Sequence, residues 1–116
     1  MFCENVINLC PNIYNIVQPM LAEDEIQKLS SVFDAIGNPI RLKILNLVNE
    51  TERPLHIKAV AKILKKDYAA IYRHVKVLEK SGLLGIYEVG RSRVLYSKNA
   101  EVAKQLIQTA KTMMQK

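Results

Sequence analysis

The segment from Asp67 to Leu84 constrains the fold of this chain more than any other. Ile71, Val75 and Leu78 recur at helical spacing and form an apolar stripe along one face of a helix. Asp67 is the kind of residue that caps such a helix at its start. The opposite face is basic and aromatic, and its residues are Tyr68, Tyr72, Arg73, Lys76 and Lys80. A helix with this outward face can lie in the major groove of DNA, so the segment is interpreted as a recognition helix.

Charge is distributed unevenly along the chain. The formal net charge of the 116 residues is +6, but residues 1–57 hold four basic and seven acidic groups, whereas residues 58–116 hold thirteen basic and four acidic groups. The first half is therefore at −3 and the second at +9. A polyanion such as double-stranded DNA is the partner that this distribution favours, and the alternative is a basic face that is only solvated.

Three further helices are predicted before the recognition helix, at residues 23–36, 39–50 and 57–65. Gly37 is expected to end the first helix in a left-handed conformation, and Asn38 and Pro39 to start the second. A tight turn at residues 65–67 then completes a helix–turn–helix, with Lys58 and Lys62 on the outer side.

The pattern changes from helical to alternating after Gly82, which predicts a two-stranded hairpin around residues 89–92. Arg91 and Arg93 lie at its tip, where they can reach phosphates or the minor groove. The fold class is therefore mainly α with a small β-hairpin, in the arrangement of a winged helix–turn–helix.

The last predicted helix, residues 99–114, has two adjoining apolar lanes. One lane is enough to pack on its own domain, and the second suggests a subunit interface; the alternative is a helix sunk into a single core. We therefore divide the chain into an apolar N-terminal arm or helix at 1–22, which joins the dimer interface, and a winged helix–turn–helix domain with its dimerisation helix at 23–116. The residues assigned to the homodimer interface are Val102, Leu106, Ile107, Ala110, Met113, Met114, Ile13 and Val17.

Two motifs, at residues 33–45 and 71–83, resemble the ArsR family of winged-helix repressors, and the resemblance extends over residues 24–112. It implies a dimeric transcriptional regulator that binds a pseudo-palindromic operator. Within the motifs, Arg41 is expected to form a salt bridge with an acid such as Asp34. His74 is expected to be a packed, hydrogen-bonded residue.

The metal sites implied by the resemblance are not retained. In metal-sensing members the helix before the turn carries two cysteines, and the matching positions here are His56 and Lys58. A protonated lysine cannot ligate a metal, so this site is not retained. Cys3, Cys10 and His56 remain as a possible remnant, although small buried cysteines are the preferred interpretation. No metal and no cofactor are therefore expected.

The cysteines form no disulfide framework, which favours a reducing, cytoplasmic location. The N-terminal residues resemble neither a signal peptide nor a membrane span.

The sequence thus predicts a sequence-specific DNA-binding transcriptional regulator, a homodimeric repressor and not an enzyme. The open alternatives are a weakly specific protein that coats DNA and a winged helix used for protein–protein contacts; activation and an unidentified small-molecule or metal inducer also stay open. The residues expected at base edges or nearby phosphates are Tyr68, Ala69, Tyr72 and Arg73. Those expected mainly at phosphates are Lys58, Lys62, Lys65, Lys66, Lys76, Arg91 and Arg93.

Overall fold

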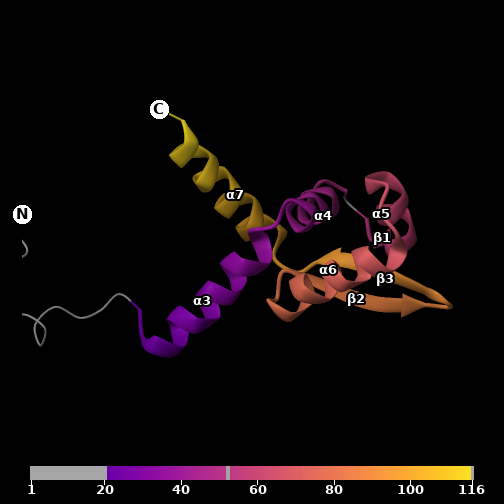
Figure 1. Cartoon of the computed structure of the whole chain (residues 1–116), viewed down its shortest axis with the longest axis horizontal. Coiled ribbons are helices and arrows are strands. Elements are labelled where there is room, and N and C mark those ends of the chain that lie inside the picture. The colour runs from indigo at the N-terminus through magenta and orange to yellow at the C-terminus, as the bar shows by residue number, and fades with distance from the viewer. Residues whose placement is uncertain (1–20, 52, 116) are drawn as a thin grey trace, which may run out of the picture.

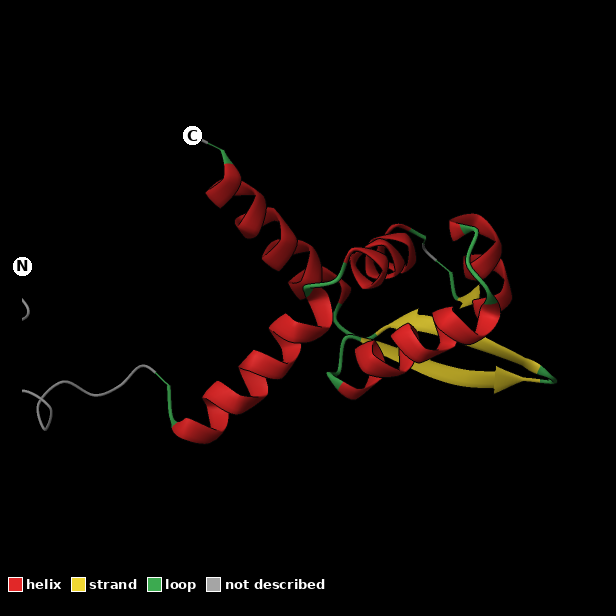
Figure 2. Ribbon diagram, viewed as in Figure 1, coloured by secondary structure: helices red, strands yellow, loops and turns green. Residues whose placement is uncertain are grey.

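The structure, a computed structural model, describes residues 21–51 and 53–115. The elements in chain order are α3 (Glu23–Ile36), α4 (Pro39–Glu50), β1 (Leu55–His56), α5 (Ile57–Leu64), α6 (Tyr68–Lys80), β2 (Leu84–Val89), β3 (Ser92–Ser97) and α7 (Ala100–Met114). In Figures 1 and 2, α4, α5, α6 and the sheet form a compact body, and α3 and α7 extend from it in different directions. This order confirms the predicted winged helix–turn–helix.

The sheet has three antiparallel strands in the order β1-β3-β2. The two-residue strand β1 pairs with β3, so the predicted hairpin gains a third, short strand. Gly90 begins the turn between β2 and β3 with a φ of 62°, a conformation that glycine adopts without a steric penalty. Gly85 pairs with Tyr96 across the hairpin, and a Cβ at position 85 would overlap the Tyr96 ring.

The core lies where α4, α5 and α6 meet the sheet. Ile71, Val75 and Leu78 of α6 are fully buried, as their spacing predicted. They belong to one apolar cluster with Ile44 and Leu45 of α4. Because these residues occupy the inner side of α6, its opposite side is left for solvent or a partner.

The start of α4 and the end of α3 before Gly37 are confirmed, but the left-handed conformation predicted for Gly37 is wrong. The Asn38 side-chain oxygen accepts hydrogen bonds from the backbone N–H groups of Ile40 and Arg41, at 2.9 and 3.2 Å, and Pro39 occupies the first position of the helix. Gly37 has a φ of −76°, so it does not end α3 in the left-handed conformation. The chain instead turns directly from α3 into the Asn38 cap.

The left-handed conformation predicted for Gly37 is found instead at Lys65, in the turn between α5 and α6. Lys65 has φ 57° and ψ 45°, the only positive φ of a non-glycine residue in the described ranges. The Lys66 N–H donates to the Ala61 carbonyl at 3.0 Å, which satisfies the end of α5. At the start of α6, Asp67 occupies the cap position but its side chain makes no capping hydrogen bond, contrary to the prediction.

Arg41 links three helices, but not through the predicted salt bridge with Asp34. Its Nε donates to the Ala35 carbonyl at 2.8 Å, and its Nη2 donates to the backbone carbonyl of Asp34 at 3.3 Å. Its Nη1 lies 3.3 Å from Nδ1 of His74. Because a guanidinium only donates, Nδ1 of His74 is the acceptor, and the expectation of a hydrogen-bonded histidine is confirmed.

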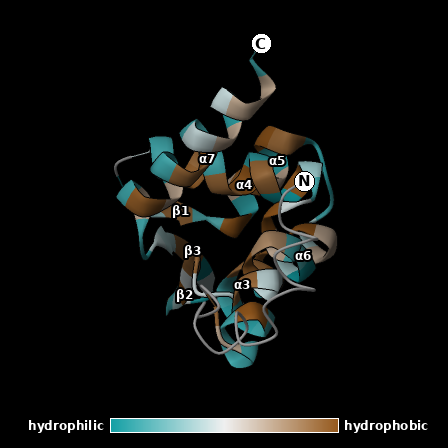
Figure 3. Ribbon diagram, turned by 90° about the vertical axis from the view of Figure 1, so that its left-hand side faces the viewer, coloured by the Kyte–Doolittle hydropathy of each residue, from teal (hydrophilic) through white to brown (hydrophobic). Residues whose placement is uncertain are grey.

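Apolar residues of α3 and α7 remain uncovered in the single chain. Phe33 of α3 is 51% exposed and Val102 of α7 is 63% exposed, and Met113 and Met114 are also exposed. Figure 3 views the molecule from the side of these two helices, and hydrophobic residues are visible on both. Ala103 is the one buried residue of α7, and Ile107 is partly buried against the same core, so the helix packs on its own body through its first half and not through its second.

Candidate nucleic-acid interface

The exposed side of α6 carries the residues that the sequence predicts at base edges. Tyr68, Ala69, Arg73 and Lys76 are exposed, and Tyr72 is half-buried. The two lysines of α5, Lys58 and Lys62, and the two of the turn, Lys65 and Lys66, are exposed as well. Contact of any of these residues with DNA stays a prediction.

Three of the predicted residues meet in one cluster that connects the wing to α6. The rings of Tyr68 and Tyr72 stack with centroids 6.4 Å apart and an interplanar angle of 11°. Arg93 of β3 reaches both rings: its Nη1 donates to the Tyr68 hydroxyl at 3.2 Å, and its Cζ lies 4.6 Å from the Tyr72 ring centroid. We call Tyr68, Tyr72 and Arg93 the tyrosine–arginine cluster. It joins the hairpin to the exposed face of α6 by a hydrogen bond and a cation–π contact.

Acidic side chains hold the neighbouring cations in place. Lys76 lies 5.9 Å from the Tyr72 ring centroid, and its Nζ forms an ion pair with Glu79 at 2.9 Å. The hydrogen bond with Glu79 is the main cause that raises the pKa of Lys76. Nε of Arg93 lies 3.9 Å from the Glu88 carboxylate. Sequence reasoning missed both glutamates; the spacing of Lys76 and Glu79 on one helix was the available signal.

The hydrogen bond from Arg93 determines what Tyr68 can do next. A phenol has one proton to donate and lone pairs that accept. Since the Tyr68 oxygen accepts from Arg93, its own proton is free for an acceptor outside the cluster. Phosphate oxygens, guanine O6 and N7, adenine N7 and thymine O4 are such acceptors, whereas the cytosine N4 amino group is not.

The structure separates the two arginines that the sequence placed together at the wing tip. Arg91 lies in the turn and is exposed, so the tip position is correct for this residue. Arg93 lies inside β3 and is directed to α6, so the tip position is wrong for it. Alternation along a strand indicates its two faces, but not which one a neighbouring helix covers.

The remnant metal site falls largely outside the described residues. His56 ends β1 directly before α5 and is exposed, while Cys3 and Cys10, like Ile13 and Val17 of the arm, lie in the part of the chain that is not described. Within 21–51 and 53–115, no three His, Cys, Asp or Glu residues are grouped so that they could hold a metal ion. In the same ranges no helix has the length and hydropathy required to cross a membrane.

Comparisons with known proteins agree with this geometry. The family model HVO_A0114 matches residues 38–103, from the cap of α4 into α7. No curated protein matches the chain.

Among solved structures, a homodimeric winged helix-turn-helix DNA-binding domain from Mycobacterium bovis, described as a possible ArsR-family transcriptional regulator, is 21% identical. Its TM-score is 0.69, with 83% of this chain and 89% of that chain covered. NolR from Sinorhizobium fredii is 21% identical with a TM-score of 0.66, over 83% of this chain and 96% of that chain. A transcriptional regulator homologue from Pyrococcus horikoshii is 25% identical with a TM-score of 0.61, over 76% and 94%. The fold is therefore that of winged-helix transcriptional regulators of the ArsR type.

Proposed function

The chain belongs to the HVO_A0114 family and shares its fold with ArsR-type regulators, and from this premise we propose that it is a homodimeric, DNA-binding transcriptional repressor. The observation that carries the proposal is the exposed face of α6, which presents two stacked tyrosines together with three cations, two of them Lys76 and, from the wing strand β3, Arg93. The third cation is Arg73, which is exposed on the same helix. Donors and aromatic rings on the outward side of a helix whose inner side is packed in the core suit a DNA groove.

In this mode α6 enters the major groove, with Tyr68, Ala69 and Tyr72 at base edges and Arg73 at bases or phosphates. Tyr68 donates its free proton to a base or phosphate acceptor, and the Ala69 methyl group can meet a thymine methyl. The lysines of α5 and of the turn, with Arg91 at the wing tip, determine the register on the phosphate backbone.

Dimerisation explains the apolar faces of α3 and α7. Phe33, Val102, Met113 and Met114 leave more apolar surface than a monomer needs, and a second copy covers it at an interface related by two-fold symmetry. The Mycobacterium bovis domain is described as homodimeric, and we propose the same for this chain. Two recognition helices then read half-sites about 34 Å apart on a pseudo-palindromic operator. Repression follows by occupancy, since a dimer across two half-sites excludes RNA polymerase from the same DNA.

Selection of bound duplexes from a random library tests the proposal directly. We expect an inverted repeat whose half-sites lie one turn of DNA apart. Affinity for the selected duplex, measured by fluorescence anisotropy at several salt concentrations, should fall with a logarithmic slope of about −7, as for roughly eight neutralised phosphates. Arg73→Ala and Arg91→Ala, each removing one positive charge, should both weaken binding, while Lys43→Ala on the exposed side of α4 removes one charge away from α6 and serves as the charge-matched control.

The other outcomes identify the rival functions. Binding with equal affinity for selected and scrambled duplexes would indicate a DNA-coating protein. The absence of binding at low salt would contradict a DNA function and favour a protein–protein module.

A further inference from the structure

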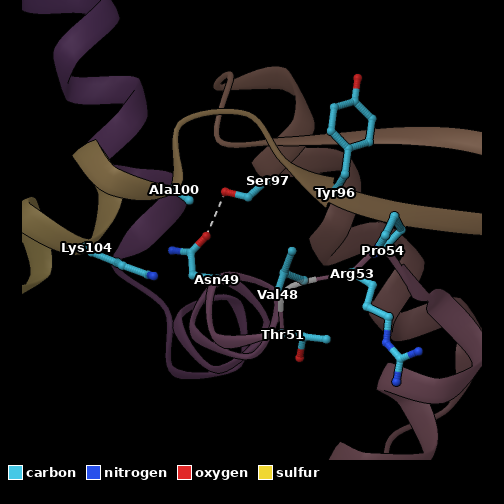
Figure 4. A pocket seen from close by; sticks show the side chains of 9 residues that line it. All are labelled: Val48, Asn49, Thr51, Arg53, Pro54, Tyr96, Ser97, Ala100 and Lys104. Atoms are coloured by element: carbon cyan, nitrogen blue, oxygen red, sulfur yellow. Dashed lines mark hydrogen bonds between the residues drawn. The ribbon is translucent and has the colours of Figure 1, made fainter.

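A pocket of about 340 Å³ lies away from α6, between the end of α4, the end of β3 and the start of α7. Its lining includes Asn49, Ser97, Tyr96 and Ala100 and the two cations Lys104 and Arg53 (Figure 4). We call it the α4–α7 pocket. None of its residues belongs to the face of α6 proposed to read DNA.

Asn49 points to a ligand because one of its polar atoms is left without a partner. Its side chain is only 7% exposed, and its Oδ1 accepts a hydrogen bond of 2.7 Å from the Ser97 hydroxyl. In this orientation of the amide, Nδ2 is the end that faces away from Ser97. Nδ2 is buried and has no hydrogen-bond partner among the described residues. In Figure 4 the amide nitrogen points to the side of Ala100 and Lys104.

An unpaired buried donor is unfavourable, and native proteins supply such groups with a partner. The missing partner of Asn49 must be a hydrogen-bond acceptor, because both hydrogens of Nδ2 donate. The amide therefore excludes a ligand that presents only donors at this point.

The charges around the pocket favour an anionic acceptor. The charged groups in the described lining are the cations Lys104 and Arg53. Ala100 is the first residue of α7, and the preceding Asn99 makes no side-chain capping bond, so the first N–H groups of a 15-residue helix remain available at the pocket. The positive end of the helix dipole acts in the same direction. Glu101, the acid of this first turn, is exposed and does not line the pocket.

The remaining walls are apolar or aromatic. Val48 and Pro54 line the pocket beside the polar groups. Tyr96 also belongs to the lining, but its ring points away from Asn49 and Ser97 in Figure 4, because it packs over Gly85 and against Tyr87. A ligand that satisfies both parts of the lining has an anionic head and an apolar body.

We propose that the α4–α7 pocket binds a small organic anion whose carboxylate or phosphate group accepts from Asn49 Nδ2 and is paired with Lys104. The site lies where the wing strand β3 ends and the proposed dimer helix α7 begins, which is a suitable position for an effector. Binding itself rests on the pocket alone and is independent of the proposed function.

Titration of the full chain with four probes tests the site: benzoate, benzamide, phenyl phosphate and inorganic phosphate. Binding is followed by isothermal titration calorimetry and by the NMR signals of the Asn49 side-chain amide and of the backbone amides of residues 100–102. We expect saturable shifts at these positions with benzoate or phenyl phosphate, and much weaker ones with neutral benzamide. Preference for benzoate assigns a carboxylate ligand, and preference for phenyl phosphate assigns a phosphate ester. Tighter binding of inorganic phosphate than of either organic anion would contradict the apolar body of the ligand.

Matched variants separate the site from general basicity. Lys104→Gln should weaken binding by about tenfold, the lower end of the range for a charge-assisted hydrogen bond. Lys111→Gln removes the same charge from the same helix outside the pocket and should leave affinity unchanged. Both lysines are exposed, so neither change should disturb folding. Equal affinity for benzoate and benzamide, equal losses in both variants, or no saturable shift with either organic anion would overturn the proposal.

Discussion

Replacing Lys65 by glycine should stabilise the protein while weakening its binding to DNA. The turn between α5 and α6 holds Lys65 at φ 57° and ψ 45°. For a residue with a Cβ, this left-handed conformation costs about 1–2 kcal/mol, and glycine avoids that cost. Glycine also adds about 0.5–1 kcal/mol of backbone entropy to be lost on folding. The net gain in the free energy of unfolding should therefore be about 0.5–1 kcal/mol.

Lys66 provides the matched control, because it neighbours Lys65, carries the same charge and does not have a positive φ. Lys66→Gly relieves no strain and incurs only the entropic penalty, so the free energy of unfolding should fall by about 0.5–1 kcal/mol. The backbone hydrogen bonds of both residues to α5 are retained in either variant. The two variants should thus differ by about 1–2 kcal/mol in opposite directions from the native protein.

Urea denaturation at equal protomer concentration measures this difference, with opposite shifts of the midpoint and an unchanged m-value. DNA binding should change differently: each variant removes one positive charge per protomer, so both should reduce affinity and the salt slope to a similar extent. If Lys65→Gly destabilises the protein as much as Lys66→Gly does, Lys65 carries no backbone strain. If neither variant alters the salt slope of DNA binding, these two lysines do not contact phosphates.

Three further predictions concern the cluster, the dimer and pH. Arg93→Gln should remove the hydrogen bond to the Tyr68 hydroxyl and reduce discrimination among DNA duplexes in anisotropy assays. Arg91→Gln should instead lower the affinity for all duplexes alike. Identical specificity profiles of the two variants would contradict the role of the tyrosine–arginine cluster. Val102→Glu should give a folded monomer in analytical ultracentrifugation, and Gln105→Glu on the same helix should remain dimeric; a dimer in both cases would exclude this face from the interface. Burial, and after it the charges of Arg41 and Arg73, lower the pKa of His74 in the folded state below its usual value of 6.5. As the pH falls, the unfolded state therefore takes up the proton first. The free energy of unfolding should then decrease as the pH drops from 6.5 toward the folded-state pKa. His74→Gln should flatten that part of a stability–pH curve measured by urea denaturation, and an unchanged curve would contradict the assignment.

Local pattern is sufficient to predict the inner side of each helix of the compact body. Ile71, Val75 and Leu78 follow the helical period, and all three are fully buried in the structure. The cap at Asn38 and the turn at Gly90 depend on backbone chemistry within a few residues, so these were also predictable.

The contacts between elements were not predictable in the same way. Arg41 was expected to pair with a carboxylate, but three acceptors from α3 and α6 occupy its guanidinium. Asn49 illustrates the same point, since a polar residue four positions after the buried Leu45 was visible in the sequence, while its partner Ser97 is 48 residues further along the chain.

The sequence alone therefore determined the order of the helices, the hairpin, the inner side of α6 and the uneven charge of the chain, because each depends on periodicity or composition over short segments. Only the tertiary structure decided that Arg93 contacts Tyr68 and Tyr72 of α6 and does not extend from the wing tip. It also decided that Asn49 lines a pocket and that its Nδ2 has no hydrogen-bond partner. The physical reason is that a side chain's partners depend on how elements distant in sequence pack, and no local pattern encodes that packing. The recognition helix was recognisable from its residues, but the proton that Tyr68 has free for DNA follows from a hydrogen bond with a strand 25 residues away.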